Sequence, residues 1–202
     1  MIPLAPLPFI LEPNQELVRG NPPPVPAKGI PAESGSAAAR TGETVEGMND
    51  RCASLSFLLA DESATMEFAQ RLAAQLQPGM MIYLQGDLGA GKTTLVRSVL
   101  NALGYTRRVK SPTYTLLEPY QVVGLDLRHF DLYRMNDEEE WESAGFRDEF
   151  NGHNIFFIEW PDKARNLLPS ADIEIVFEIL PQGRRVEIFG HTVMGNTCLK
   201  QL

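Results

Sequence analysis

A glycine-rich stretch near the middle of the chain combines the residue types that hold phosphate groups. The pattern G-x-x-x-x-G-K-S/T is met by Gly86-Asp87-Leu88-Gly89-Ala90-Gly91-Lys92-Thr93. Glycines let backbone N–H groups close around phosphate oxygens, and Lys92 is placed to reach the β- and γ-phosphates of a nucleotide. The hydroxyl of Thr93 is placed to bind Mg2+. The stretch predicts a nucleotide-binding loop, and we include the next residue, Thr94, among its candidate contacts.

A second magnesium ligand is expected at the end of a strand. Four apolar residues, Ile155–Ile158, lead directly to Glu159. Ligands of open α/β sheets bind beyond the carboxyl ends of the strands, so a carboxylate there is well placed to hold magnesium directly or through water. Glu159 is therefore our candidate for the metal, and the alternative is a solvated glutamate at a strand end.

Two more candidates lie between these motifs. Alternate residues of a strand share one face, so the run HFDLYR puts His129, Asp131 and Tyr133 together. Asp131 is our candidate for orienting the attacking water, although a structural bond to His129 or to a loop would also explain it. Thr113, in the stretch SPTYT, is a candidate sensor of the γ-phosphate, with a turn beside a proline as the alternative.

These residues need a sheet and helices to bring them together. Two continuous apolar runs, 80–85 and 154–160, have the pattern of strands buried on both faces. Further strands are predicted at 54–60, 114–123, 126–133, 172–180 and 184–189. Helices are predicted at about 63–76, 91–103 and 137–150, and from Pro161 to Leu168. We therefore predict an α/β fold: a P-loop NTPase-like, largely parallel sheet flanked by helices, with a C-terminal antiparallel hairpin formed by the last two strands.

The first 50 residues differ in composition from the rest of the chain. Nine of the 15 prolines precede residue 34, and residues 32–46 are mostly small and polar. Such a segment buries too little apolar surface to offset the chain entropy lost on folding. We predict that residues 1–50 are disordered, or that residues 1–47 are upstream sequence and Met48 is the true initiator. Residues 51–202 are predicted to form one P-loop domain.

Composition excludes several classes of protein. The 202 residues carry a net charge of −8, so the chain is a poor candidate for gripping the phosphate backbone of a nucleic acid unaided. Two cysteines are too few for a disulfide scaffold or a multi-cysteine zinc finger. No apolar run approaches the roughly 20 residues of a membrane span, and prolines interrupt the apolar N-terminus, which argues against a signal peptide. We expect a soluble, cytoplasmic protein with no membrane partner.

Four segments, taken in order, resemble the TsaE family, also called YjeE. They are LQGDLGAGKTTLVR (84–97), VKSPTYTLLEPY (109–120), RHFDLYRM (128–135) and FIEWP (157–161). Many NTPases share the first segment, whereas the combination of the other three is much more specific. The resemblance covers about residues 52–190. The family usually lacks a counterpart of residues 1–50, and the segment after Gly190 matches no family pattern.

The resemblance implies an activity, cofactors and partners. Family members are small ATPases, weak alone, of bacterial tRNA threonylcarbamoyladenosine modification, and they bind the TsaD–TsaB pair and are thought to reset it by ATP hydrolysis. The resemblance matches Lys92 and Thr93 to the Walker residues and Glu159 to the metal carboxylate. It matches Asp131 to an essential aspartate, which with Lys92 would be catalytic, and Thr113 to a switch-like segment. ATP and Mg2+ are the implied cofactors, and tRNA would be contacted only indirectly, through the other subunits.

Two other functions stay open. A small-molecule P-loop kinase usually carries a lid with several arginines, whereas the arginines after residue 134 are scattered: Arg147, Arg165, Arg184 and Arg185. A nucleotide-binding regulator without turnover has no need of a water-orienting acid such as Asp131. Phosphate release in the presence and absence of the expected partners would separate these functions from an ATPase.

Overall fold

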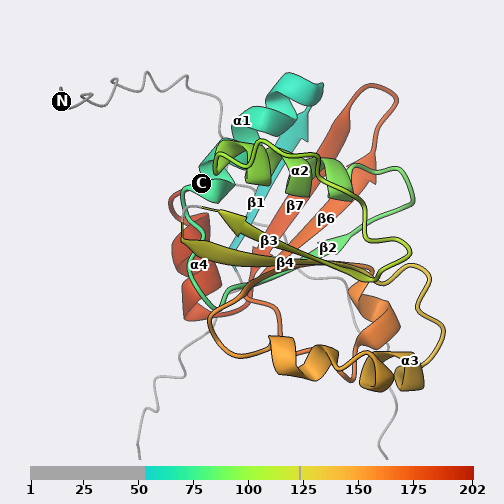
Figure 1. The fold of residues 1–202 in the computed structure, drawn as a ribbon. Helices are drawn as coiled ribbons and strands as arrows, with labels where there is room; N and C mark the ends of the chain where they lie inside the picture. Colours follow the sequence, from blue (N-terminus) through green and yellow to red (C-terminus); the bar gives the residue numbers. More distant parts are fainter. Residues whose placement is uncertain (1–52, 123) are drawn as a thin grey trace, which may run out of the picture.

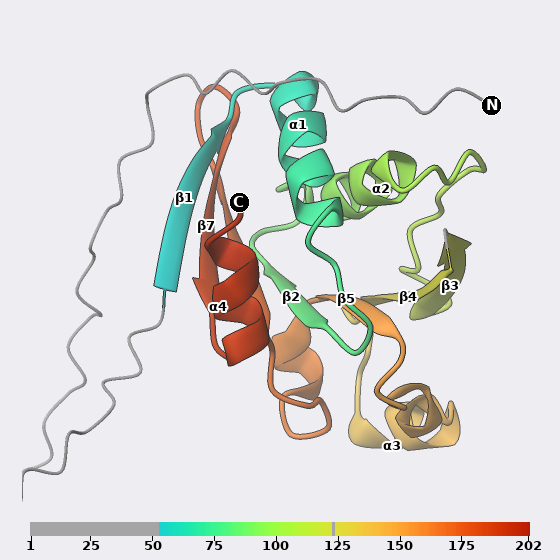
Figure 2. The same ribbon diagram turned by 90° about the vertical axis from the view of Figure 1, so that its left-hand side faces the viewer.

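A seven-stranded sheet with helices on both faces is formed by residues 53–122 and 124–202, which are the residues described by the computed structural model (Figures 1 and 2). Its strands are β1 (Ala53–Leu59), β2 (Met81–Gln85), β3 (Leu117–Val122), β4 (Leu125–Asp131), β5 (Ile155–Glu159), β6 (Ile173–Ile179) and β7 (Arg184–Gly190). The α-helices are α1 (Glu62–Ala73), α2 (Lys92–Ala102), α3 (Glu138–Ser143) and α4 (Val193–Leu199). The predictions for residues 1–50 and for Met48 lie outside the described residues.

The centre of the sheet is parallel and its edges are antiparallel. The strand order is β1-β7-β6-β2-β5-β4-β3. The neighbouring pairs from β6 through β2 and β5 to β4 are parallel. The β6–β7 hairpin, β1 beside β7, and β3 beside β4 are antiparallel. This is the predicted P-loop NTPase-like α/β sheet with its C-terminal hairpin, and Pro119 lies in β3, an edge strand, where proline is tolerated.

The helices α1 and α2, which lie on the same face of the sheet, each begin at a residue suited to cap a helix. The side chain of Asp61 caps α1 by accepting a hydrogen bond from the N–H of Ala64 at 2.9 Å. Phe68 and Leu72 lie four residues apart on one face of α1 and are buried. Gly91 caps α2 with a left-handed φ of 109°, a conformation that costs glycine little. The loop can therefore turn directly from β2 into α2.

Alternate residues of the sheet enter two separate hydrophobic clusters. In β2, Ile82 and Leu84 belong to the cluster that also contains residues of α1, α2 and α4. Met81 belongs to the opposite cluster, with Phe130 of β4 and Trp141 of α3. Figure 1 shows α1 and α2 on one side of the sheet and α3 on the other. By the same alternation, the side chains of the last residues of β4 and β5 point to the face of the sheet that α2 covers, near the start of α2.

Two predicted helices are shorter than expected. The helix predicted over 137–150 is divided, because Gly145 adopts a left-handed φ of 69° that ends α3 before a short 3-10 helix over Phe146–Glu149. The helix predicted from Pro161 to Leu168 is a 3-10 helix over Pro161–Ala164. Pro169 follows soon after and has no N–H with which to continue a helix.

The C-terminal helix was not predicted, although it is preceded by Thr192, a residue type that commonly caps helices. The hydroxyl of Thr192 accepts a hydrogen bond from the N–H of Gly195 at 3.1 Å and so begins α4. Within the described ranges, no helix is long and apolar enough to cross a membrane. The two continuous apolar runs form β2 and β5 as predicted.

Candidate nucleotide-binding site

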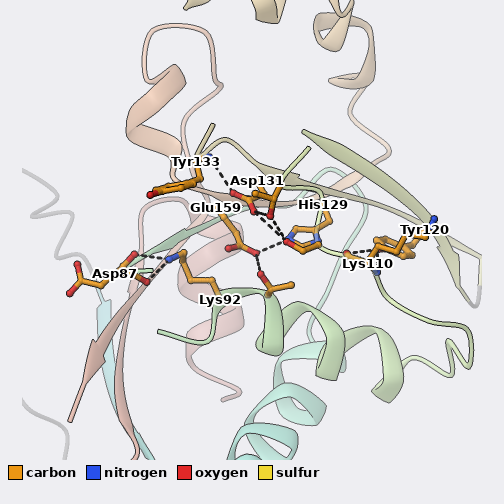
Figure 3. A network of polar contacts seen from close by, with 12 residues as sticks. Asp87, Lys92, Lys110, Tyr120, His129, Asp131, Tyr133 and Glu159 are labelled. Atoms are coloured by element: carbon orange, nitrogen blue, oxygen red, sulfur yellow. Dashed lines mark hydrogen bonds and ion pairs between the residues drawn. The ribbon is translucent and has the colours of Figure 1, made fainter. Parts of the chain in front are cut away.

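The glycine-rich loop joins the carboxyl end of β2 to the first turn of α2 (Figure 3). Gly86 has a φ of 131°, and an added Cβ there would lie 2.7 Å from the carbonyl oxygen of Phe177 in β6. A side chain at this position would meet both backbone strain and the neighbouring strand. The loop can lie close to the sheet only because residue 86 is glycine, and this places its N–H groups beside the start of a helix, where anions bind.

Lys92 is folded back into the loop. Its Nζ donates hydrogen bonds to the backbone oxygens of Gly86 at 2.6 Å and Asp87 at 2.9 Å, and the residue is only 4% exposed. Burial lowers the pKa of Lys92, and the nearby carboxylates of Glu159, Asp131 and Asp87 oppose this shift. The ammonium therefore sits among oxygen atoms that a phosphate group could replace as acceptors.

Glu159 accepts hydrogen bonds from two sides. Thr93 donates from Oγ1 to Oε1 of Glu159 at 2.7 Å, and His129 Nε2 lies 2.9 Å from the same oxygen. Both His129 and Glu159 are buried. A carboxylate only accepts hydrogen bonds, so Nε2 of His129 donates to it. His129 Nδ1 is buried and has no hydrogen-bond partner in the described part of the chain.

Asp131 lies beside Glu159 across the parallel pair of β4 and β5. Its Oδ2 accepts a hydrogen bond from Thr113 Oγ1 at 2.8 Å and a longer one from Ser111 Oγ at 3.4 Å. Its Oδ1 accepts one from the backbone N–H of Tyr133 at 3.2 Å. Asp131 is thus bound to the loop that contains Thr113, and these contacts fix a carboxylate next to the end of β5.

An aromatic residue closes one side of the site. Trp160 has a φ of 58°, a left-handed conformation that is unusual for a bulky residue and is found mostly where function requires it. The ammonium of Lys92 lies 4.2 Å from the centre of the Trp160 ring, a cation–π contact. Tyr133 also packs against Trp160, with ring centres 5.1 Å apart. Lys92 is thus buried beside an aromatic ring.

The structure brings most of the sequence-predicted site residues together. Thr93 is bonded to Glu159, Lys92 precedes Thr93 and bonds the loop, and Asp131 and Thr113 are joined to each other beside Glu159. The remaining loop positions form the connection itself: Gly86, Asp87, Leu88, Gly89, Ala90 and Gly91. Leu88 is 68% exposed at its tip, and Thr94 is half-buried in the first turn of α2.

Two further residues belong to the site although sequence analysis gave them no place in it. Ser111 bonds Thr113 at 2.7 Å. Arg184 of β7 lies against the loop, since a Cβ at Gly91 would be 2.9 Å from its Nε. Arg184 is distant in sequence, and only the strand order reveals it. Tyr133 was expected on the strand with Asp131, but β4 ends at Asp131 and Tyr133 lies in the turn beyond.

The donor set fits a magnesium–nucleotide complex better than an all-protein metal centre. No group of three or more His, Cys, Asp or Glu side chains suited to a metal occurs among the residues that the structure describes. Mg2+ is commonly held by one or two protein oxygens together with phosphates and water. The hydroxyl of Thr93 and the carboxylate of Glu159, 2.7 Å apart, are ligands of this kind. These two residues could hold the ion beside the loop.

Comparison with known proteins identifies a family model, relatives and a solved structure that this chain resembles. The model of the family described as "Threonylcarbamoyl adenosine biosynthesis protein TsaE" matches residues 59–186. The "tRNA threonylcarbamoyladenosine biosynthesis protein TsaE" of Haemophilus influenzae is 42% identical over 151 residues, covering 72% of this chain and 96% of the relative. That of Bacillus subtilis is 38% identical over 132 residues, covering 65% and 81%. The crystal structure of Bacillus subtilis YdiB is similar with a TM-score of 0.64 and 27% identity, covering 75% of this chain and 95% of that one.

Proposed function

We propose that this chain, which belongs to the TsaE family of threonylcarbamoyl adenosine biosynthesis proteins, is a Mg2+-dependent ATPase. It hydrolyses ATP slowly alone and acts on a TsaD–TsaB pair during tRNA modification. The observation that carries the proposal is the meeting of Lys92, Thr93 and Glu159 at the start of α2, with Asp131 beside them. A phosphate-binding loop alone would support nucleotide binding. A second carboxylate, that of Asp131, beside the proposed metal ligand Glu159 supports hydrolysis as well.

Each residue has a task that its position suits. Lys92 exchanges its two backbone acceptors for phosphate oxygens, so its positive charge meets the charge that develops during transfer. Bound Mg2+ would draw charge from the β- and γ-phosphate oxygens. Glu159 and Thr93 supply oxygens for it. Asp131, held by Thr113 and the Tyr133 N–H, orients the attacking water and accepts its proton.

The partner and the nucleotide are parts of the same proposal. Family membership supports ATP as the nucleotide and the TsaD–TsaB pair as the partner. The net charge of −8 fits a protein whose partner subunits make most of the contacts with tRNA. The proposal also places the chain in the cytoplasm, where tRNA is modified.

Phosphate release from Mg-ATP tests the proposal directly. The full chain is assayed alone and with a purified TsaD–TsaB pair, with the Lys92→Ala variant as the control for contaminating ATPases. We expect slow release by the chain alone, a rise of about tenfold or more with the pair, and background rates for the variant.

Other outcomes assign other functions. Release that the pair leaves unchanged contradicts the partner-dependent role, and the search then turns to a small-molecule phosphoryl acceptor. Tight binding of Mg-ATP without release in either condition indicates a nucleotide-binding regulator. Unchanged release by Lys92→Ala would contradict the assignment of the loop itself.

A further inference from the structure

A cavity lies beside the end of α2, and no residue of the Lys92 loop lines it. It measures about 750 Å³, and its lining consists of Arg97, Asn101, Thr106, Arg107, Arg108, Val109, Lys110 and Ser111. One wall is the exposed side of α2 and the other is the segment that leads from α2 toward β3, seen at the right of Figure 2. Four of its eight lining residues carry a positive charge, and none carries a negative one. We name these four residues, Arg97, Arg107, Arg108 and Lys110, the basic cluster.

The charge of the basic cluster is not neutralised by the protein. All four side chains belong to exposed residues, and none forms an ion pair within residues 53–122 and 124–202. Arg128, Arg147, Arg165 and Arg185 each contact a carboxylate, whereas other cations of the described residues, such as Arg134, have no ion pair. What distinguishes the basic cluster in a chain of net charge −8 is that four such cations line one cavity. It creates a positive potential that attracts an anionic partner.

The segment that carries the cluster is held in place. The hydroxyl of Tyr120 accepts a hydrogen bond from the N–H of Lys110 at 3.3 Å and donates one to its carbonyl oxygen at 3.1 Å, and Figure 3 shows the two residues together. Tyr105 packs edge-on against the Tyr120 ring, with ring centres 5.2 Å apart. Val109 is buried, with 7% exposed. Because the backbone is fixed by these contacts, less conformational entropy is lost when the cations bind a ligand.

The residues that line the cavity distinguish between two kinds of anionic partner, an acidic protein and a nucleic acid. Protein interfaces are anchored by apolar and aromatic side chains at their centre. Here Val109 is the single apolar residue of the lining, and no aromatic side chain lines the cavity. Asn101 and Thr106 have an amide and a hydroxyl group, and these together with arginine and lysine are the usual donors to phosphate and sugar oxygens. The hydroxyl of Ser111 already bonds Thr113 and Asp131. The absence of aromatic rings from the lining also means that bases have nothing to stack on.

We propose that the basic cluster binds the sugar–phosphate backbone of RNA. The relatives of this chain are named as tRNA threonylcarbamoyladenosine biosynthesis proteins, so RNA is present where they work. A few phosphate contacts of this kind position RNA without reading its sequence. They are compatible with the acidic surface elsewhere, because four local cations supply a weak, salt-dependent contact.

The test measures RNA binding by the full chain with fluorescence anisotropy of a labelled tRNA transcript. The variant Arg107→Glu/Arg108→Glu reverses two exposed charges of the cluster. The control Lys163→Glu/Lys200→Glu makes the same change of net charge at two exposed positions outside the cavity. A milder variant, Arg107→Gln/Arg108→Gln, repeats the test without introducing carboxylates, and circular dichroism checks that each protein is folded.

We expect wild-type binding at low salt with a slope of log K against log salt of about −3 to −4, as four phosphate contacts predict. The reversal variant loses about tenfold or more in affinity, and its slope falls by about 2, whereas the control stays within about threefold of wild type. The neutral variant falls between them. Lys92→Ala binds RNA like the wild type, which separates this proposal from the ATPase proposal.

Three results overturn the inference. One is the absence of saturable binding by the wild type at low salt. Another is an equal loss in the reversal and control variants, which would mean that net charge alone governs binding. The third is competition by polyglutamate at least as effective as competition by unlabelled RNA of matched charge, which would assign the cavity to an acidic protein.

Discussion

Glu159 joins the phosphate loop to the sheet through one oxygen atom. Its Oε1 accepts the hydrogen bonds of Thr93 and His129, so a change of its charge leaves the surrounding shape intact only if the new side chain keeps an acceptor there. Glutamine does so, and it removes the negative charge that attracts a divalent cation.

We predict that Glu159→Gln weakens magnesium activation of ATP hydrolysis by about 10- to 100-fold while it changes metal-free nucleotide binding little. A magnesium titration of phosphate release, with nucleotide binding followed separately, measures both effects. Glu178→Gln, at an exposed position of β6, is the matched control. A wild-type magnesium titration by Glu159→Gln would remove this residue from the metal site.

Asp131 has the position of a group that acts on water. Its two oxygens accept hydrogen bonds from Thr113 and from the Tyr133 N–H, and asparagine offers one acceptor oxygen in the same place. We predict that Asp131→Asn retains ATP binding and loses hydrolysis by about 10²- to 10⁴-fold. Equilibrium binding and single-turnover hydrolysis measured on the same preparation decide this. Weakened binding with a normal rate per bound ATP would instead indicate a structural aspartate.

His129 is a positioning residue, since it contacts Glu159 and not the nucleotide loop. Leucine at this position removes the donor to Glu159, whereas the amide of glutamine extends to where Nε2 lies. We predict that His129→Leu raises the magnesium concentration for half-maximal hydrolysis by about tenfold, and that His129→Gln recovers most of this loss. If both variants lower only the thermal midpoint and leave the magnesium dependence unchanged, His129 serves the core alone.

At the scale of residues, the sequence identifies the residues of the site better than it predicts the contacts between them. The loop motif and the position of Glu159 after an apolar run were readable, because spacing along the chain places them. The bond between Thr93 and Glu159 depends on the pairing of β2 with β5, which joins Leu84 to Glu159 across a gap of 75 residues. The left-handed backbone of Trp160 opposes the local preference of a bulky residue, so only the surrounding structure determines it.

At the scale of elements, continuous apolar runs were the most reliable signal. β2 and β5 were predicted within a residue or two of their observed ends, since strands buried on both faces leave little ambiguity. Helices after residue 137 were predicted less well, because glycine at 145 and proline at 169 limit their length. α4 has seven residues and weak intrinsic propensity, so its stability comes from packing that sequence reasoning does not reveal.

The packing of α4 suggests a test at one glycine. An added Cβ at Gly195 would lie 1.9 Å from the carbonyl oxygen of Asp172, so the helix lies directly against that backbone. We predict that Gly195→Ala lowers the free energy of unfolding by about 1–3 kcal/mol because α4 must move outward.

Urea denaturation measures this change. Val193→Ala is the control, since Val193 lies in the same helix, is 86% exposed, and its change should stay within about 0.5 kcal/mol. Equal stability of Gly195→Ala and wild type would show that α4 can shift without loss, against the close packing described.

At the scale of the whole molecule, one hydrophobic cluster connects the nucleotide loop to the C-terminal helix. Leu95 and Val96 of α2 and Cys198 and Leu199 of α4 all belong to it, through the sheet residues between them. The matched family region ends at residue 186, so α4 lies outside it and yet completes the same core. If this core unfolds as a unit, a nucleotide bound at Lys92 stabilises α4 as much as it stabilises α2.

The thiol of Cys198 reports on that coupling. Burial raises the pKa of Cys198 to about 11 and shields it, so alkylation at neutral pH requires opening of the core. Below the denaturation midpoint in urea, Mg-ATP at about 100 times its dissociation constant should slow alkylation of Cys198 about 100-fold, equivalent to about 2.7 kcal/mol. Mass spectrometry of the Cys198 peptide measures the rate, and Lys92→Ala, which should show no protection, is the control. Equal alkylation rates with and without Mg-ATP would mean that α4 opens by local unfolding, independently of the core that holds the phosphate loop.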